Sequence, residues 1–124
     1  MSSVLRGIVL AHGQVAEALV GAVEEITGVS GALVPVSNAG CDLGVLEDRI
    51  RAAVAGGEAL VFVDLPNGSC FVAAMHALGQ LPGVRVVTGV NLTMLLDFVF
   101  HRTDPIDDAA ARAGRMGVRA IAGT

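Results

Sequence analysis

The stretch Gly7-Ile8-Val9-Leu10-Ala11-His12-Gly13 decides the fold, because an apolar run ends there in a histidine and a glycine. Together with Leu5, this run predicts a buried strand over residues 5–11. From Gln14 to Thr27 the apolar residues recur with the period of a helix, and Gly28 is a suitable stop. The first unit of the chain is therefore a strand that passes through His-Gly directly into a helix.

The same alternation of strand and helix continues along the chain. Asp42 and Ser69 are expected to cap two later helices, and Asp107 or Asp108 to begin the last one. Residues 118–122 are expected to form a terminal strand. The remaining strands are expected at residues 32–36, 59–64 and 84–88, and the remaining helices at about 42–55, 69–81 and 92–102.

Strand–helix alternation at this spacing predicts βαβ units with parallel strands and right-handed crossovers. We expect an α/β fold, a doubly wound and mainly parallel open sheet in the order 2-1-3-4, with helices on both faces. No repeat or linker divides the chain, so residues 1–124 are expected to form one domain. Function in such sheets is located outside the carboxyl ends of the strands, where the strand order reverses.

Composition and charge exclude several classes of protein. Hydrophobic residues make up 53% of the chain and charged residues 16%, which argues against intrinsic disorder. The net charge of −4, with no Lys and eight scattered Arg, argues against nucleic-acid binding. No apolar stretch is long enough to span a bilayer, so we expect a cytoplasmic protein without direct membrane insertion. The two cysteines form no Cys-x-x-Cys pattern and signal neither a metal site nor a disulfide.

Two polar residues stand at the ends of apolar strands that the order 2-1-3-4 makes neighbours. His12 follows the first strand and Asp64 ends the third, so the two are expected to meet at the switch point. A carboxylate that accepts a hydrogen bond from one imidazole nitrogen fixes the tautomer and makes the other nitrogen more nucleophilic. Gly13 and Asn67-Gly68-Ser69 open helices nearby and offer N–H groups for an anion. On these residues alone, a structural His and a capping Asp remain an alternative.

Three motifs in order resemble the mannose-family (mannose/fructose/sorbose) IIA component of the sugar phosphotransferase system. Residues 7–17, Gly-Ile-Val-Leu-Ala-His-Gly-Gln-Val-Ala-Glu, are similar to its active-site opening. Asp64-Leu65, Gly68-Ser69 and Phe71 are similar to its second motif, Asp-Leu-x-Gly-Gly-Ser/Thr-Pro-Phe. Residues 89–95, Gly-Val-Asn-Leu-Thr-Met-Leu, are similar to its third, Gly-Val-Asn-x-Pro-Met-Leu.

The resemblance implies a phosphotransferase in which His12 is phosphorylated and Asp64 is its hydrogen-bonding partner. By the resemblance, Gly68 and Ser69 would lie near the phosphoryl oxygens. Gly13 is expected to add an N–H group because it opens the first helix. The implied partners are HPr as phosphoryl donor and a IIB component as acceptor, and the family usually forms homodimers by exchange of a C-terminal strand. Residues 118–122 are the candidate for that strand. No cofactor or metal is needed.

The chain departs from the resembling motifs at four positions: Asn67, Cys70, Val72 and Thr93. Asn67 replaces a glycine, and asparagine tolerates the left-handed backbone that glycine supplies. Cys70 replaces a proline near a helix N-terminus, where a thiol can become acidic, although a buried and inert thiol is favoured. These changes leave the histidine chemistry intact and bear on the identity of the partner and the sugar.

Two other functions are alternatives to the phosphocarrier. Ser69, His12 and Asp64 have the makings of a hydrolase triad, but the Gly-x-Ser-x-Gly elbow is absent and a capping role for Ser69 is favoured. Labelling by a fluorophosphonate probe would distinguish these roles. The second alternative is a phosphorylation-dependent regulatory binding module without a transport role. His76 and His101 are expected to be structural, since neither has a second ligand at metal spacing.

Overall fold

The computed structural model describes residues 4–79 and 81–123, and the described part is built around one parallel four-stranded sheet. The strand order is β2-β1-β3-β4, which confirms the predicted 2-1-3-4 arrangement. The strands are β1 (Arg6–Ala11), β2 (Leu33–Ser37), β3 (Ala59–Val63) and β4 (Val84–Thr88). All three strand pairs are parallel, so the carboxyl ends of the strands lie at one edge.

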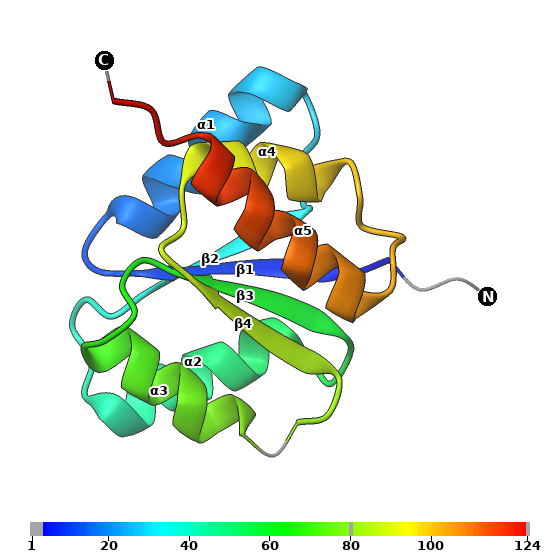
Figure 1. Ribbon diagram of the computed structural model, residues 1–124. Helices are drawn as coiled ribbons and strands as arrows, with labels where there is room; N and C mark the ends of the chain where they lie inside the picture. The colour runs from blue at the N-terminus through cyan, green and yellow to red at the C-terminus, as the bar shows by residue number, and fades with distance from the viewer. Residues whose placement is uncertain (1–3, 80, 124) are drawn as a thin grey trace.

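Helices cover both faces of this sheet, as predicted (Figure 1). One face carries α2 (Leu43–Val54) and α3 (Ser69–Leu78), which pack on each other and on the sheet. The opposite face carries α1 (Val15–Thr27), α4 (Leu92–Val99) and α5 (Ile106–Arg119). The connection after β1 therefore crosses one face and the connection after β3 crosses the other. The strand order reverses between β1 and β3, and this is the switch point of the fold.

The two apolar cores follow from the alternation of side chains along the strands. Ile8 on β1 faces α2 and α3, whereas Val9 faces the other three helices, and both are fully buried. On the second face the rings of Phe62 and Phe98 meet edge to face, with centroids 5.2 Å apart. A Cβ atom at Gly7 would stand 2.5 Å from the Phe98 ring, so glycine allows α4 to pack closely on β1.

Several helix boundaries differ from the predicted ones for identifiable reasons. The Asp42 carboxylate accepts the Val45 N–H, which confirms it as the cap of α2. Ser69, by contrast, makes no cap hydrogen bond, because Gly68 occupies the N-cap position of α3. Helix α4 ends at Val99, three residues early, in a turn closed by i→i+3 bonds. Helix α3 ends at Leu78, three residues before the predicted end at 81, and residue 80 lies outside the described residues.

The C-terminal part of the chain corrects two predictions. Helix α5 begins at Ile106, before Asp107 and Asp108, because Pro105 precedes it with the φ of −55° that suits a helix start. Val118 belongs to α5, and residues 120–123 have no strand, so the predicted terminal strand is wrong for the single chain. The helical pattern simply continues, and the tail leaves α5 without running beside β4 (Figure 1). Among the described residues, no helix combines the length and apolar character needed to cross a membrane.

Candidate functional site

The parallel pairing of β1 and β3 brings His12 and Asp64 together at the switch point. Leu10 pairs with Val63, so the residues that follow the two strands are neighbours. His12 Nδ1 lies 2.8 Å from Asp64 Oδ2, and the His12 main-chain N–H donates to the same oxygen at 2.9 Å. The other carboxylate oxygen accepts the Leu65 N–H. The predicted contact between these residues is therefore present, and three donors hold the carboxylate in one orientation.

This contact determines which imidazole nitrogen is available for chemistry. The Asp64 side chain is only 15% exposed, whereas the His12 side chain is 40% exposed. An ionised carboxylate can only accept, so the proton of a neutral His12 ring belongs on Nδ1. The lone pair is then on Nε2, on the side of the ring away from Asp64. The site therefore presents one oriented nucleophile or base.

The start of α3 lies beside Nε2. Gly68 has a φ of +90°, a conformation that side chains disfavour, and a Cβ there would stand 3.9 Å from His12 Nε2. The Ser69 hydroxyl lies 3.4 Å from the same nitrogen. Asn67 does not adopt a left-handed backbone, so Gly68 alone supplies the unusual turn that the motif requires. Instead of capping its helix, Ser69 directs its hydroxyl toward His12.

The order Ser69–His12–Asp64 matches the connectivity of a hydrolase triad. The Ser69 Oγ lies 3.4 Å from His12 Nε2. A nucleophile and its general base are normally about 2.6–3.2 Å apart. No elbow sequence surrounds Ser69, as noted above. The Ser69 hydroxyl therefore lies beside Nε2, but the geometry does not favour Ser69 as a nucleophile activated by His12.

Asn38, which follows β2, completes the site and was not identified from the sequence. Its side-chain oxygen accepts the Gly13 N–H at 3.1 Å, and its amide nitrogen lies 3.5 Å from the Ser69 hydroxyl. The Ser37 hydroxyl donates to the Gly13 carbonyl at 2.6 Å. Arg49 donates to the carbonyls on either side of Asn38 and holds this turn in place. Three loops are therefore linked around His12, and the Gly13 N–H already has a partner.

Cys70 lies beneath the histidine. It is fully buried, and its Sγ is 3.7 Å from His12 Nδ1. Burial raises the pKa of the Cys70 thiol to about 11, and the negative charge of Asp64 adds to this effect. The helix N-terminus does not acidify this thiol, which is therefore protonated at neutral pH in the metal-free protein, in line with the buried thiol favoured from the sequence.

The two other histidines take structural positions, as predicted. His76 pairs with Glu47 across α3 and α2, at 3.1 Å. The ring of His101 contacts the Asp97 carbonyl one turn earlier, at 2.7 Å. Neither lies in the crevice.

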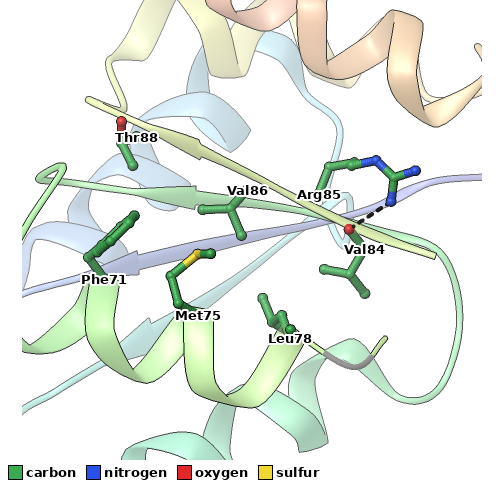
Figure 2. A pocket seen from close by; sticks show the side chains of 8 residues that line it. Phe71, Met75, Leu78, Val84, Arg85, Val86 and Thr88 are labelled. Carbon is green, nitrogen blue, oxygen red and sulfur yellow. Dashed lines mark hydrogen bonds between the residues drawn. The ribbon is translucent and has the colours of Figure 1, made fainter. Parts of the chain in front are cut away.

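A separate apolar groove lies between α3 and the edge strand β4 (Figure 2). Its volume is about 370 Å³, and the side chains that surround it come from one face of α3 and from β4. Phe71, Met75 and Leu78 project from α3 toward Val84 and Val86 (Figure 2). The groove is next to the site but contains none of the residues predicted for it.

Fold and site together define a doubly wound α/β domain with an oriented histidine–aspartate pair at its switch point. Residues 7–113 match the family described as PTS system fructose IIA component. The PTS system sorbose-specific EIIA component of Klebsiella pneumoniae is 31% identical over 99 residues, which cover 77% of this chain and 73% of that protein. The chain therefore belongs to the IIA component family of the sugar phosphotransferase system, and the resemblance stated from the motifs is confirmed.

Solved structures agree with this fold. The mannose/sorbose specific IIA subunit of the phosphotransferase system from Enterococcus faecalis has a TM-score of 0.86 at 26% identity, covering 98% of this chain and 96% of that one. Phosphotransferase system component EIIA from Streptococcus agalactiae has a TM-score of 0.89 at 24% identity, covering 96% of both chains. These likenesses extend over nearly the whole described fold.

Proposed function

We propose that this chain is a cytoplasmic phosphocarrier that accepts a phosphoryl group from phospho-HPr on His12 and passes it to a IIB component for sugar uptake. The observation that carries the proposal is the 2.8 Å contact between His12 Nδ1 and Asp64, which leaves Nε2 directed toward the start of α3. Membership of the IIA component family supports the same chemistry.

The transfer is a displacement between two nitrogens. The His12 Nε2 lone pair attacks phosphorus, a new N–P bond forms, and the N–P bond of the donor breaks with its electron pair returning to the donor. The proton on His12 Nδ1 stays where it is, so the phosphorylated ring becomes cationic. Asp64 stabilises this cation through the short hydrogen bond. Onward transfer to the IIB component reverses these steps, and the protein supplies positioning and electrostatics.

The phosphoryl oxygens are proposed to be bound by main-chain N–H groups and by Ser69. The first intrahelical bond of α3 runs from Val72 to Gly68, so the N–H groups before Val72 have no partner within the helix. They point toward the end of the helix that favours anions. The absence of a side chain at Gly68 leaves room beside Nε2. Gly13 contributes its N–H if the Asn38 oxygen gives way to the phosphoryl group.

Intact mass after incubation with phosphoenolpyruvate, enzyme I and HPr tests the proposal. Wild type is expected to gain one acid-labile phosphoryl group, and His12→Ala none. His76→Ala is the matched control, since it removes a surface histidine with a carboxylate partner of its own. Label retained on His12→Ala, or no gain on wild type with cognate HPr, would overturn the phosphocarrier proposal.

The same assay separates the phosphocarrier from the regulatory alternative. When a IIB component is added to the phosphorylated wild-type chain, the phosphoryl group should pass from His12 to the IIB component in a single-turnover experiment. A chain that is phosphorylated on His12, resists every IIB component of its host and binds a partner in only one phosphorylation state would instead be a regulatory module.

We further propose that the chain acts as a homodimer. Strand β4 is an edge of the sheet, and the apolar groove beside it exposes Met75, which is 47% exposed (Figure 2). Val118 and Ile121 near the C-terminus are 69% and 77% exposed, so apolar surface is available at both places. Light scattering should give twice the chain mass of 12.6 kDa. A single-chain mass at micromolar concentration would exclude the dimer.

A further inference from the structure

We propose that His12, Asp64 and Cys70 together form a binding site for one zinc-type divalent cation. The ligand atoms, an imidazole nitrogen, a carboxylate oxygen and a thiol sulfur, all lie within 4.8 Å of one another. Nitrogen, sulfur and carboxylate oxygen are the ligands that Zn²⁺ takes in proteins. In the part of the chain that the structure describes, this is the one place where three such groups converge.

The two ligand–ligand distances at His12 Nδ1 are close to those around a tetrahedral ion that replaces the proton between His12 and Asp64, and Cys70 lies within 4.8 Å of Asp64. Zinc lies about 2.0–2.3 Å from its ligands, which places the ligand atoms roughly 3.3–3.7 Å apart. The Cys70 Sγ is 3.7 Å from His12 Nδ1 and already has this spacing. The 2.8 Å contact between Nδ1 and Asp64 Oδ2 would widen by about half an ångström. The fourth position would remain open on the crevice side.

The three ligands come from three different elements, so the framework of the site exists without the ion. His12 follows β1, Asp64 follows β3, and Cys70 is the second residue of α3. Paired strands fix the first two, and the Asp64 N–H is itself bonded to the Leu10 carbonyl. Since the His12 side chain is partly exposed, an ion can enter past the ring. The phosphoryl chemistry proposed above has no use for the thiol.

Metal binding would prevent phosphorylation, a consequence that rests on the proposed function. A neutral imidazole has one nitrogen with a free lone pair and one with a proton. An ion bound at Nδ1 displaces the proton from that nitrogen to Nε2, and the Cys70 thiol binds as a thiolate and releases its own proton to solvent. Nε2 then has no electron pair with which to attack phosphorus. A bound ion therefore switches off the carrier without occupying the phosphoryl position.

Cobalt, a spectroscopic substitute for zinc, tests the site on the full, unphosphorylated chain. Co²⁺ should give the intense visible bands of tetrahedral coordination and a thiolate-to-cobalt charge-transfer band. Cys70→Ala should lose the charge-transfer band, and it should weaken Zn²⁺ binding by about 100-fold, measured by competition with a chromophoric chelator. Cys41→Ala, at the half-buried second cysteine, is the matched control and should keep both. Cys70→Ser provides the same test should the alanine variant fail to fold.

A wild-type spectrum without the sulfur band, or equal zinc affinity in Cys70→Ala, would overturn the site. Its inhibitory consequence is tested separately, by phosphorylation from phospho-HPr with and without Zn²⁺. The rate with Zn²⁺ divided by the rate without it should be roughly 0.1 or less in wild type and near one in Cys70→Ala. A wild-type ratio near one would refute inhibition. Failure of the proposed function would instead appear as no phosphorylation without zinc, while the cobalt spectrum still reports the site.

Discussion

Replacement of Asp64 by asparagine tests how the carboxylate controls His12. Three N–H groups converge on this carboxylate: the His12 ring, the His12 main chain and the Leu65 main chain. An asparagine amide has one acceptor oxygen. If that oxygen faces His12, the NH₂ group faces the Leu65 N–H, and the hydrogen bond to Leu65 is lost. With the amide rotated, the NH₂ group faces the ring, Nδ1 must accept, and the proton moves to Nε2.

The magnitude follows from the loss of a charge-assisted hydrogen bond. Such a bond contributes about 1.5–3 kcal/mol, and it is strongest when the phosphorylated ring is cationic. Because each 1.36 kcal/mol corresponds to about a factor of ten in rate, phosphorylation of Asp64→Asn should be roughly 10- to 150-fold slower. The rate is measured by rapid quench from phospho-HPr in single turnover, with circular dichroism to verify folding.

Asp48→Asn is the matched control, because Asp48 is 81% exposed on α2 and loses the same charge. Its rate should equal that of wild type. A folded Asp64→Asn protein that is phosphorylated within about twofold of the wild-type rate would refute the reasoning that the carboxylate sets the tautomer. An equal loss of rate in both variants would attribute the effect to net charge and would also refute it.

The remaining predictions concern the loops around the histidine and the buried thiol. Gly68→Ala places a methyl group near Nε2 and strains a φ of +90°, so phosphorylation should slow at least tenfold, whereas Gly114→Ala in α5 should not slow it. Asn38→Ala removes the link between two loops and should slow the same reaction roughly 2- to 10-fold, the cost of one or two neutral hydrogen bonds. Because burial raises the pKa of Cys70 to about 11, the folded state keeps a proton that the unfolded chain releases above about pH 9.0. Stability should therefore fall as the pH rises between these values, and thermal melts should show a smaller fall for Cys70→Ala than for Cys41→Ala.

The alkaline measurement is unusually clean in this chain. It has no Lys and no Tyr, so the cysteines are the side chains with ordinary pKa values in that range. The folded state binds more protons than the unfolded state there, so the slope of stability with pH is negative. A flat profile for wild type would mean that the thiol is not shielded as its burial indicates.

The sequence was sufficient to place His12 and Asp64 because both end strongly apolar strands. Once the alternation predicts a parallel sheet, the order 2-1-3-4 puts these strands side by side. The same reasoning applies to Asn38, which follows β2, the other neighbour of β1. It was missed because β2 includes a proline and ends in Ser37, so its end is poorly marked. The signal that could have identified Asn38 is its position: like Asp64, it is a polar residue just after a strand that pairs with β1.

Other details could not follow from sequence patterns. The role of Ser69 depends on Gly68, whose positive φ moves the cap position one residue earlier. A serine before an apolar run predicts a cap whether or not that turn is present. The terminal strand failed for a different reason. Val118 and Ile121 have strand propensity, but a strand also needs a partner, and within one chain α5 continues instead.

The metal site and the phosphocarrier site require opposite states of one imidazole, and this makes their coupling reciprocal. Phosphoryl transfer needs the proton on His12 Nδ1, between the ring and Asp64, whereas a metal ion needs that position itself. Whatever factor the ion imposes on the equilibrium for phosphorylation, phosphorylation must impose on metal affinity. Phosphorylated wild type should therefore bind Co²⁺ at this site at least tenfold more weakly than the unphosphorylated chain, because the ion must first displace the proton on His12 Nδ1. Because the competition is between an ion and a proton, the loss of Co²⁺ affinity on phosphorylation should shrink as the pH rises and the Nδ1 proton is released, whereas purely steric exclusion would give a loss that does not change with pH.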